Sequence, residues 1–419
     1  MALSTRPAAA AKTSWKWGAL LFLVVAGLLL WANHRFLTAS GRYVNEDFMS
    51  YWLGGRALLE GVDPYDAAVW IPLRERYGSS WFPDERPPQP PWTTLLFLPI
   101  SALSLNVGAA AWLAISQVAL SLSVWLLLCL GDGRRPSPAA FGLVLLVAFT
   151  FRGTLVTLQN GQLGLALLFV ITLFLVLVRV HQPFWAGIAL AFLALKPNAF
   201  VLLAPLVGLW LIWRRQWQIL AGAAAGVIGL VVVSLAVEPG WLSAWLSVRG
   251  KTEVAFLTPT VWGLAYELTP AWWPLVGLLL AAAVTAVTGW LMVTHTAWDE
   301  LVVVPLAVAA SLLVTPYAWD YEHTLLLVSL VLLLPRWQPR PLAWARWLFL
   351  AWVWPWFLFW IANQRNSGTL TFMVPLLVGV IWWLAWRRGG VGADGEFPVG
   401  EPAVTAPAIP ITPGEVDDL

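Results

Sequence analysis

The polar residues at membrane depth that could do chemistry gather in four short segments between long apolar runs. These segments are NEDFMSYWLGGRALLEGVDPYD at 45–66, Arg152 with the motif QNGQ at 159–162, Lys-Pro-Asn at 196–198, and TPYAWDYEH at 315–323. Ionisable groups at membrane depth are costly and usually face an interior cavity. We therefore expect the four segments to line one polar pocket.

The residue types in this set suit the transfer of a sugar from a lipid phosphate to a hydroxyl group. A carboxylate, here Asp47, can accept the proton of an attacking hydroxyl as a general base. Negative charge also stabilises the oxocarbenium-like centre that forms at the anomeric carbon. A phosphate leaving group needs cations rather than a strong acid. The side chains that could hold the donor phosphate or its sugar are Lys196, Arg152, His323, Arg56, Gln162, Asn160 and Trp319.

Two other acids, Glu46 and Asp320, are alternatives to Asp47 as the base. Asp320 and Glu322 with the nearby His323 are too sparse a pattern to indicate a metal site. We expect no metal and no cofactor other than the lipid-linked sugar donor, polyprenyl-phosphate-mannose or a similar compound. No glycine-rich phosphate loop follows a strand, so we expect the donor to arrive through the membrane rather than as a nucleotide sugar.

The elements that position these residues must be membrane helices. Of 419 residues, 60% are hydrophobic and only 11% are charged, which excludes a water-soluble protein. A net charge of +2 without any long basic stretch argues against nucleic acid as a partner. The single cysteine, Cys129, excludes a disulfide framework. The 31 tryptophans are typical of a protein at the bilayer interface, where they can also stack on sugars.

Apolar runs long enough, or nearly long enough, to cross a bilayer recur along the chain. A crossing needs about 20 residues. The runs lie near 18–31, 108–130, 139–151, 163–180, 183–195, 199–213, 218–237, 273–293, 301–315, 324–335, 342–361 and 370–386. They predict an all-α polytopic membrane body, residues 1–388, with about twelve spans. The segment 93–103 is too short to cross and is interpreted as re-entrant or interfacial.

The positions of the cations predict which side of the membrane each loop faces. If the runs alternate in direction, one side receives Arg134, Arg135, Arg179, Arg214, Arg215, Arg336, Arg340, Arg346, Arg387 and Arg388. By the positive-inside rule this side is cytoplasmic, and both termini lie there. The Gly- and Pro-rich tail, 389–419, is expected to be a disordered cytoplasmic segment. The polar pocket then faces outward from a plasma membrane.

The first outer loop, 38–92, is expected to carry the base on an amphipathic helix. Asp47, Tyr51, Gly54 and Leu58 would share one helical face, so we expect this helix to lie flat on the membrane. Gly61-Val62-Asp63-Pro64 should end it.

The order of these motifs resembles glycosyltransferase family 87, which has the GT-C fold. The resemblance rests on the helix that ends in PYD at 64–66, on PPQPPWTTLLFLPISAL, on Gln159-Asn160-Gly161-Gln162, on GIALAFLALKPNAFVLLAPL and on TPYAWDYEH. It implies transfer from a polyprenyl-phosphate sugar, commonly mannose, with inversion at the anomeric carbon. It also implies that Asp47 is the base.

The sequence thus predicts a glycosyltransferase that moves a hexose, mannose by resemblance, to a lipid-linked or glycan hydroxyl on the outer face. Its partners would be the polyprenyl-phosphate sugar, the glycolipid or glycan acceptor, and the bilayer. The alternative from another class is a polytopic transporter or lipid flippase with the same cavity, which would show paired half-length helices and no transfer activity. A glycolipid-binding subunit without activity is a further alternative.

Overall fold

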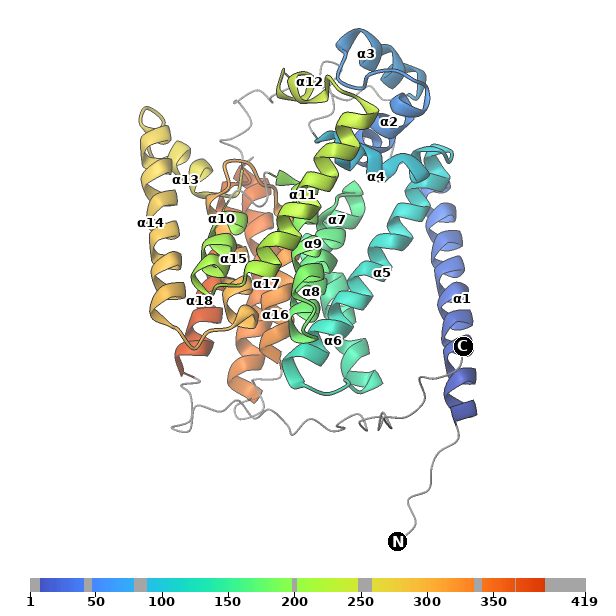
Figure 1. The fold of residues 1–419 in the computed structure, drawn as a ribbon. Coiled ribbons are helices and arrows are strands. Elements are labelled where there is room, and N and C mark those ends of the chain that lie inside the picture. Colours follow the sequence, from blue (N-terminus) through green and yellow to red (C-terminus); the bar gives the residue numbers. More distant parts are fainter. Residues whose placement is uncertain are drawn as a thin grey trace, which may run out of the picture.

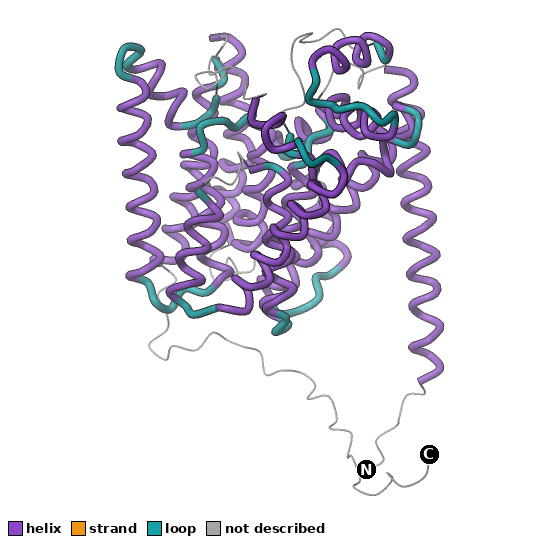
Figure 2. The backbone as a smooth tube through the Cα atoms, turned by 45° about the horizontal axis from the view of Figure 1, so that its top comes forward, coloured by secondary structure: helices purple, strands orange, loops and turns teal. Residues whose placement is uncertain are grey.

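The chain folds into a bundle of helices in the computed structural model, which describes residues 8–40, 47–78, 89–197, 202–247, 258–334, 341–365 and 367–388 (Figure 1). Across these ranges all regular structure is helical, without a strand (Figure 2). The predicted all-α class is therefore confirmed for the described residues. Glu46 and the tail at 389–419 lie outside them.

The helices follow one another with short connections. In chain order they are α1 (Ala8–Ser40), α2 (Asp47–Leu59), α3 (Ala67–Arg76), α4 (Pro91–Ser101), α5 (Leu105–Asp132), α6 (Pro138–Thr150), α7 (Arg152–Asn160), α8 (Gly164–Arg179), α9 (Pro183–Ala191), η2 (Phe192–Leu195), α10 (Leu203–Trp213), α11 (Trp217–Val237), α12 (Trp241–Ser247), α13 (Val261–Leu268), α14 (Trp273–Thr294), α15 (Glu300–Val314), η5 (Asp320–Leu326), α16 (Leu327–Leu333), α17 (Pro341–Arg365), η7 (Thr369–Phe372) and α18 (Met373–Arg388). The η elements are 3₁₀ helices. The predicted apolar runs coincide with these helices, as 108–130 does with α5 and 273–293 with α14.

Several of these helices can cross a membrane, so the protein is a multi-pass membrane protein. Within the described ranges, five helical stretches are long and apolar enough to do so: Leu23–Ser40, Leu105–Asp132, Trp217–Val237, Trp273–Thr294 and Thr369–Trp386. A sixth span forms if α6 and α7, which meet at a 64° bend, are counted as one. Helices α8, α10 and α15 are apolar but shorter. The predicted total of about twelve spans stays a prediction.

Local sequence explains where several helices begin and end. Ser137 caps α6 by accepting a hydrogen bond from the Ala140 amide, and Pro138 occupies its first turn, where no amide donor is needed. Asp299 caps α15 in the same way, through the Leu301 amide. Helix α7 ends at Gly161, whose φ of 65° places it in the left-handed region that favours glycine.

Glycine allows α9 and α11 to cross in direct backbone contact. A Cβ atom at Gly187 would lie 2.0 Å from the carbonyl oxygen of Ile219, and one at Gly222 would lie 2.0 Å from that of Phe184. Close approach at small residues is the usual basis of packing between membrane helices, because lipid supplies little driving force for association. Any side chain at these two positions would force the helices apart.

A cluster of charged groups joins three helices at one end of the bundle, drawn at the bottom of Figure 1. Arg179, at the end of α8, pairs with Asp299 and, through Nε at 2.9 Å, with Glu300 at the start of α15. Arg214, which follows α10, donates a hydrogen bond to the carbonyl oxygen of Thr296 at 3.1 Å. Two of the arginines that were predicted to face the cytoplasm therefore lie at the same end.

At the opposite end, drawn at the top of Figure 1, α2, α3, α4 and α12 cover the bundle. Helix α2 packs against α4, and eight of its thirteen residues are buried. Among the buried residues are Phe48, Trp52 and Leu53. The helix is therefore surrounded largely by protein, and its predicted flat placement on the membrane stays a prediction.

Candidate active site

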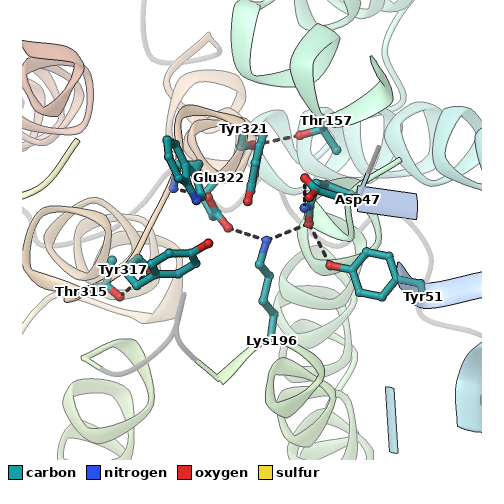
Figure 3. Close-up of polar contacts among 10 residues, drawn as sticks. Asp47, Tyr51, Thr157, Lys196, Thr315, Tyr317, Tyr321 and Glu322 are labelled. Carbon is teal, nitrogen blue, oxygen red and sulfur yellow. Dashed lines mark hydrogen bonds and ion pairs between the residues drawn. The ribbon is translucent and has the colours of Figure 1, made fainter. Parts of the chain in front are cut away.

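The candidate site is centred on Asp47, the first residue of α2 (Figure 3). Its Oδ2 atom accepts a hydrogen bond from Nε2 of Gln162 at 2.5 Å. The aspartate is only partly buried, whereas Gln162 is 4% exposed. One oxygen of the carboxylate is thus held from inside the protein.

Gln162 follows the turn that ends α7, and its backbone is fixed on both sides. Its amide donates to the carbonyl oxygen of Thr157 at 2.9 Å, and the indole of Trp112 donates to the carbonyl oxygen of Gly161 at 2.8 Å. The side-chain oxygen of Gln162 accepts two hydrogen bonds, from Tyr51 Oη and from Lys196 Nζ, both at 2.9 Å. Gln162 therefore connects α2 with the segment that follows η2.

Lys196 lies where regular helix stops. Residues 192–195 form the 3₁₀ helix η2, and α10 begins at Leu203. The carbonyl oxygens of Ala194 and Leu195 accept hydrogen bonds from Trp92 Nε1 at 2.7 Å and Thr93 Oγ1 at 2.8 Å. Helix α4, the predicted short segment, thereby holds the backbone from which Lys196 projects. The lysine is 9% exposed.

Glu322 on η5 is the charged partner of Lys196. The lysine Nζ lies 2.5 Å from Oε1 of Glu322 and 4.5 Å from the centre of the Tyr321 ring. The other carboxylate oxygen of Glu322 accepts a hydrogen bond from the Trp319 amide at 2.6 Å. Glu322 is 1% exposed, so both of its oxygens are engaged inside the protein.

Helix α7 fixes η5 from the other side. Thr157 Oγ1 donates to the carbonyl oxygen of Tyr321 at 2.9 Å, and the hydroxyls of Thr154 and Thr324 are 3.1 Å apart. A Cβ atom at Gly153 would lie 2.6 Å from the Thr324 amide nitrogen, so the two backbones are in contact. The bend between α6 and α7 is what brings α7 alongside η5.

The structure brings together three of the predicted site residues, namely Asp47, Gln162 and Lys196. Arg152 and His323 form a neighbouring group: Arg152 pairs with Asp320, and its guanidinium carbon lies 3.6 Å from the centre of the Phe359 ring. His323 is 3% exposed and lies within electrostatic reach of Arg152. Asp320, one of the two alternative bases, is therefore already paired with Arg152.

The remaining predicted residues lie at the edge of this region or away from it. Trp319 contributes its backbone amide to Glu322, and its ring lies edge-on to Tyr317 at 6.2 Å. Asn160 is half-buried at the end of α7. Arg56 lies on another face of α2, where it pairs with Glu60 at 3.1 Å, and Glu60 also accepts from Arg76. The structure does not join Arg56 to the Asp47 cluster.

Tyr51 and Glu322 belong to the cluster but were not predicted as site residues. The sequence carried a signal for Tyr51, because it follows Asp47 by four residues and therefore lies on the same helical face. Burial and the adjacent Asp47 carboxylate raise the pKa of Tyr51 well above its ordinary value, so its hydroxyl remains a donor. Glu322 had no comparable signal, since only the tertiary fold places it beside Lys196.

No set of three His, Cys, Asp or Glu residues that could hold a metal ion occurs in the part of the chain that the structure describes. The cluster instead offers a partly exposed carboxylate, a lysine and buried phenols. Lys196 donates a hydrogen bond to Gln162 and forms an ion pair with Glu322. In this arrangement Asp47 can accept a proton, and Lys196 can present an N–H donor to an anion bound in the same cluster.

The fold and the site together define a class of protein. It is a multi-pass helical membrane protein in which a carboxylate, an amide and a lysine are joined at one end of the bundle. The profile of glycosyltransferase family 87 matches residues 89–316, which is more than half of the chain. The chain belongs to this family, and it is a membrane glycosyltransferase. No curated protein and no solved structure matches it. The match includes Gln162 and Lys196, whereas Asp47 and Glu322 lie outside it.

Proposed function

We propose that this glycosyltransferase moves a hexose, mannose by family resemblance, from a polyprenyl phosphate to a hydroxyl of a lipid-linked or glycan acceptor on the outer face of the plasma membrane. The observation that carries the proposal is the Asp47 carboxylate, partly exposed and held by Gln162 beside Lys196. The reaction is a single displacement with inversion. The acceptor oxygen bonds to the anomeric carbon as the bond from that carbon to the phosphate oxygen breaks, and Asp47 takes the proton of the hydroxyl.

Asp47 is the best-placed base among the described acids of this region. Asp320 is paired with Arg152, and Glu322 is buried with one oxygen beside Lys196 and the other bonded to the Trp319 amide. A base must be within hydrogen-bond reach of the acceptor hydroxyl. Asp47 meets this requirement because hydrogen bonding to Gln162 engages only one of its two oxygens.

The leaving phosphate would bind beside Lys196, whose ammonium group donates to Gln162 and pairs with Glu322. Arg152 and His323 would lie near the phosphate, with the charge of Arg152 balanced by Asp320. Asn160 and Trp319 would contact the sugar at the edge of the site. Arg56 is paired with Glu60 away from this cluster.

The course of three helices supports an outward-facing site. Helix α8 runs from the turn that holds Gln162 to Arg179, α10 separates the Lys196 segment from Arg214, and α15 runs from Glu300 to the segment before η5. The site and the arginine cluster therefore lie at opposite ends of the same helices. The positive-inside rule assigns the arginine end to the cytoplasm, and with it the site to the outside.

These helices are also short. Helix α8 has 16 residues and α15 has 15, which correspond to about 24 and 22 Å of rise, less than the hydrocarbon thickness of about 30 Å. The site at their ends is therefore recessed toward the membrane interior. Such a depth suits a substrate whose phosphate is attached to a lipid chain and reaches the site from within the bilayer.

The proposal is tested with purified protein in nanodiscs, radiolabelled polyprenyl-phosphate-mannose and a lipid extract as the acceptor. We expect transfer by the wild type and a loss of at least about 100-fold in Asp47→Asn, with donor binding retained. Asp66→Asn is the matched control, because Asp66 is an exposed acid of the same loop that caps α3, and asparagine also caps helices. This control should keep full activity.

Equal transfer by wild type and Asp47→Asn would exclude Asp47 as the base. Donor binding without transfer of any polyprenyl-phosphate hexose or pentose would refute the transferase proposal and favour a flippase or a binding subunit. Transfer of another hexose but not of mannose would refute only the choice of sugar.

A further inference from the structure

The side chain of Gln162 makes three hydrogen bonds to protein groups, with Asp47, Tyr51 and Lys196. We propose that Gln162 is a positioning residue, which orients the carboxylate of Asp47 and ties it to Lys196, rather than a residue that binds the sugar. The inference rests on the proposed function, because it assigns Gln162 a part in placing the general base.

The orientation of the Gln162 amide follows from its partners. A lysine ammonium group can only donate hydrogen bonds, and the protonated Tyr51 hydroxyl, held among apolar and acidic neighbours, donates as well. The amide atom that faces both must be the oxygen. The nitrogen must then face Asp47, whose ionised carboxylate can only accept.

The oxygen of Gln162 has two lone pairs, and Tyr51 and Lys196 occupy both. One of its two N–H groups is directed at Asp47 Oδ2 at 2.5 Å. Because the side chain is 4% exposed, little of it remains for a sugar hydroxyl. The amide is thus committed to the network between α2 and the segment that follows η2.

The backbone that carries Gln162 is rigid enough to act as a support. It follows Gly161 in the left-handed turn, donates to Thr157, and lies next to a carbonyl held by Trp112. On the other side, Tyr51 stacks on Phe97 with ring centroids 5.0 Å apart. Such support is what keeps a reacting group in the geometry that transfer requires.

This arrangement has two consequences for Asp47. The hydrogen bond at Oδ2 fixes the plane of the carboxylate and leaves Oδ1 for the acceptor hydroxyl. Tyr51 and Tyr321 lie within electrostatic reach of this carboxylate.

The test compares Gln162→Met and Gln162→Glu with a matched control, Gln159→Met. Gln159 is an exposed glutamine of the same motif, three residues earlier on α7. For each variant in nanodiscs, the measured quantities are folded yield, donor affinity, and kcat and KM per folded protein, with polyprenyl-phosphate-mannose as the donor.

We expect Gln162→Met to lower kcat by roughly 10- to 100-fold, the usual effect of losing a hydrogen bond to a charged group. The donor KM should change by less than about 3-fold, because the substitution should leave the binding of the donor in the ground state unchanged. Gln162→Glu should lower kcat further, since a second carboxylate then faces Asp47 and repels it. Gln159→Met should match the wild type.

Three results would overturn the inference. A rise in donor KM with unchanged kcat would make Gln162 a substrate contact. A fall in folded yield with wild-type kcat per folded protein would make its role purely structural. An unchanged kcat in Gln162→Glu would show that the residue does not act on the base. If the wild type itself transfers no sugar, the proposed function fails first, which distinguishes the two failures.

Discussion

The ion pair between Lys196 and Glu322 allows a quantitative test of how the site is built. Both side chains are buried, with exposed fractions of 10% and 1%, and the charged atoms are 2.5 Å apart. Removing one partner of a buried pair leaves an uncompensated charge, which costs about 3–5 kcal/mol. Replacing both partners with apolar residues of similar volume is often nearly neutral. The pair is therefore suited to a double-mutant cycle with methionine.

The expected size depends on what remains beside each charge. In Glu322→Met, Lys196 keeps the Gln162 oxygen and the face of the Tyr321 ring, so we expect a loss near the lower end, about 3 kcal/mol. In Lys196→Met, Glu322 keeps only the Trp319 amide among the contacts described, so the loss should be larger, about 4 kcal/mol. The double variant should lose about 1–2 kcal/mol, which gives a coupling energy of several kcal/mol.

The assay is reversible unfolding in detergent–denaturant mixtures, followed by the fluorescence of the chain's tryptophans. The matched control is the exposed pair Arg56–Glu60, with side-chain exposures of 33% and 26%, replaced by methionine in the same way. Exposed pairs contribute at most about 1 kcal/mol. Coupling in the Lys196–Glu322 cycle no larger than in the control cycle would refute the view that this buried pair joins η5 to the segment after η2.

Two further predictions concern the helices that hold the site. Gly187→Ala should lower stability by about 1–3 kcal/mol and reduce transfer, because its Cβ would overlap the Ile219 carbonyl and push α9, which leads into the Lys196 segment, away from α11. Gly208→Ala, where no atom lies within 4 Å of the new Cβ, is the control, and equal melting temperatures for the two variants would contradict the packing argument. Asn33→Leu should weaken the attachment of α1 to α5 by about 0.6–2 kcal/mol, since it removes two amide hydrogen bonds of 3.0 and 3.3 Å to Gln117. Disulfide crosslinking between cysteines placed on α1 and α5 measures this attachment, and unchanged crosslinking would show that the amides do not hold the helix.

The helices themselves could be predicted from the sequence for a simple reason. In a bilayer each backbone amide and carbonyl group must be hydrogen-bonded within its own segment. A long apolar run that crosses the bilayer therefore forms a helix. The runs at 108–130 and 273–293 accordingly coincide with α5 and α14. Two helix boundaries in the structure also have local causes, because Gly161 and Pro138 carry conformational preferences that do not depend on tertiary contacts.

Only some of the residues that form the site could be predicted from the sequence. Asp47, Gln162 and Lys196 could be named because each is a polar residue next to a break in an apolar run, where a membrane protein does not tolerate it without a reason. Tyr51 could have been added from its spacing relative to Asp47. Arg56 was predicted to bind the donor, yet it is paired with Glu60, which follows it by four residues on the same helical face.

What only the tertiary structure decided is which polar groups meet. Gln162 and Asp47 are separated by 115 positions along the chain, and Arg152 and Asp320 by 168. Such pairs depend on the bend between α6 and α7 and on the glycine contacts that set how helices cross, which are properties of packed surfaces rather than of local sequence. The sequence by itself determined a membrane-embedded helical chain with a polar end. The packing of its helices determined that Lys196 pairs with Glu322, that Arg152 pairs with Asp320, and that Gln162 holds one oxygen of Asp47.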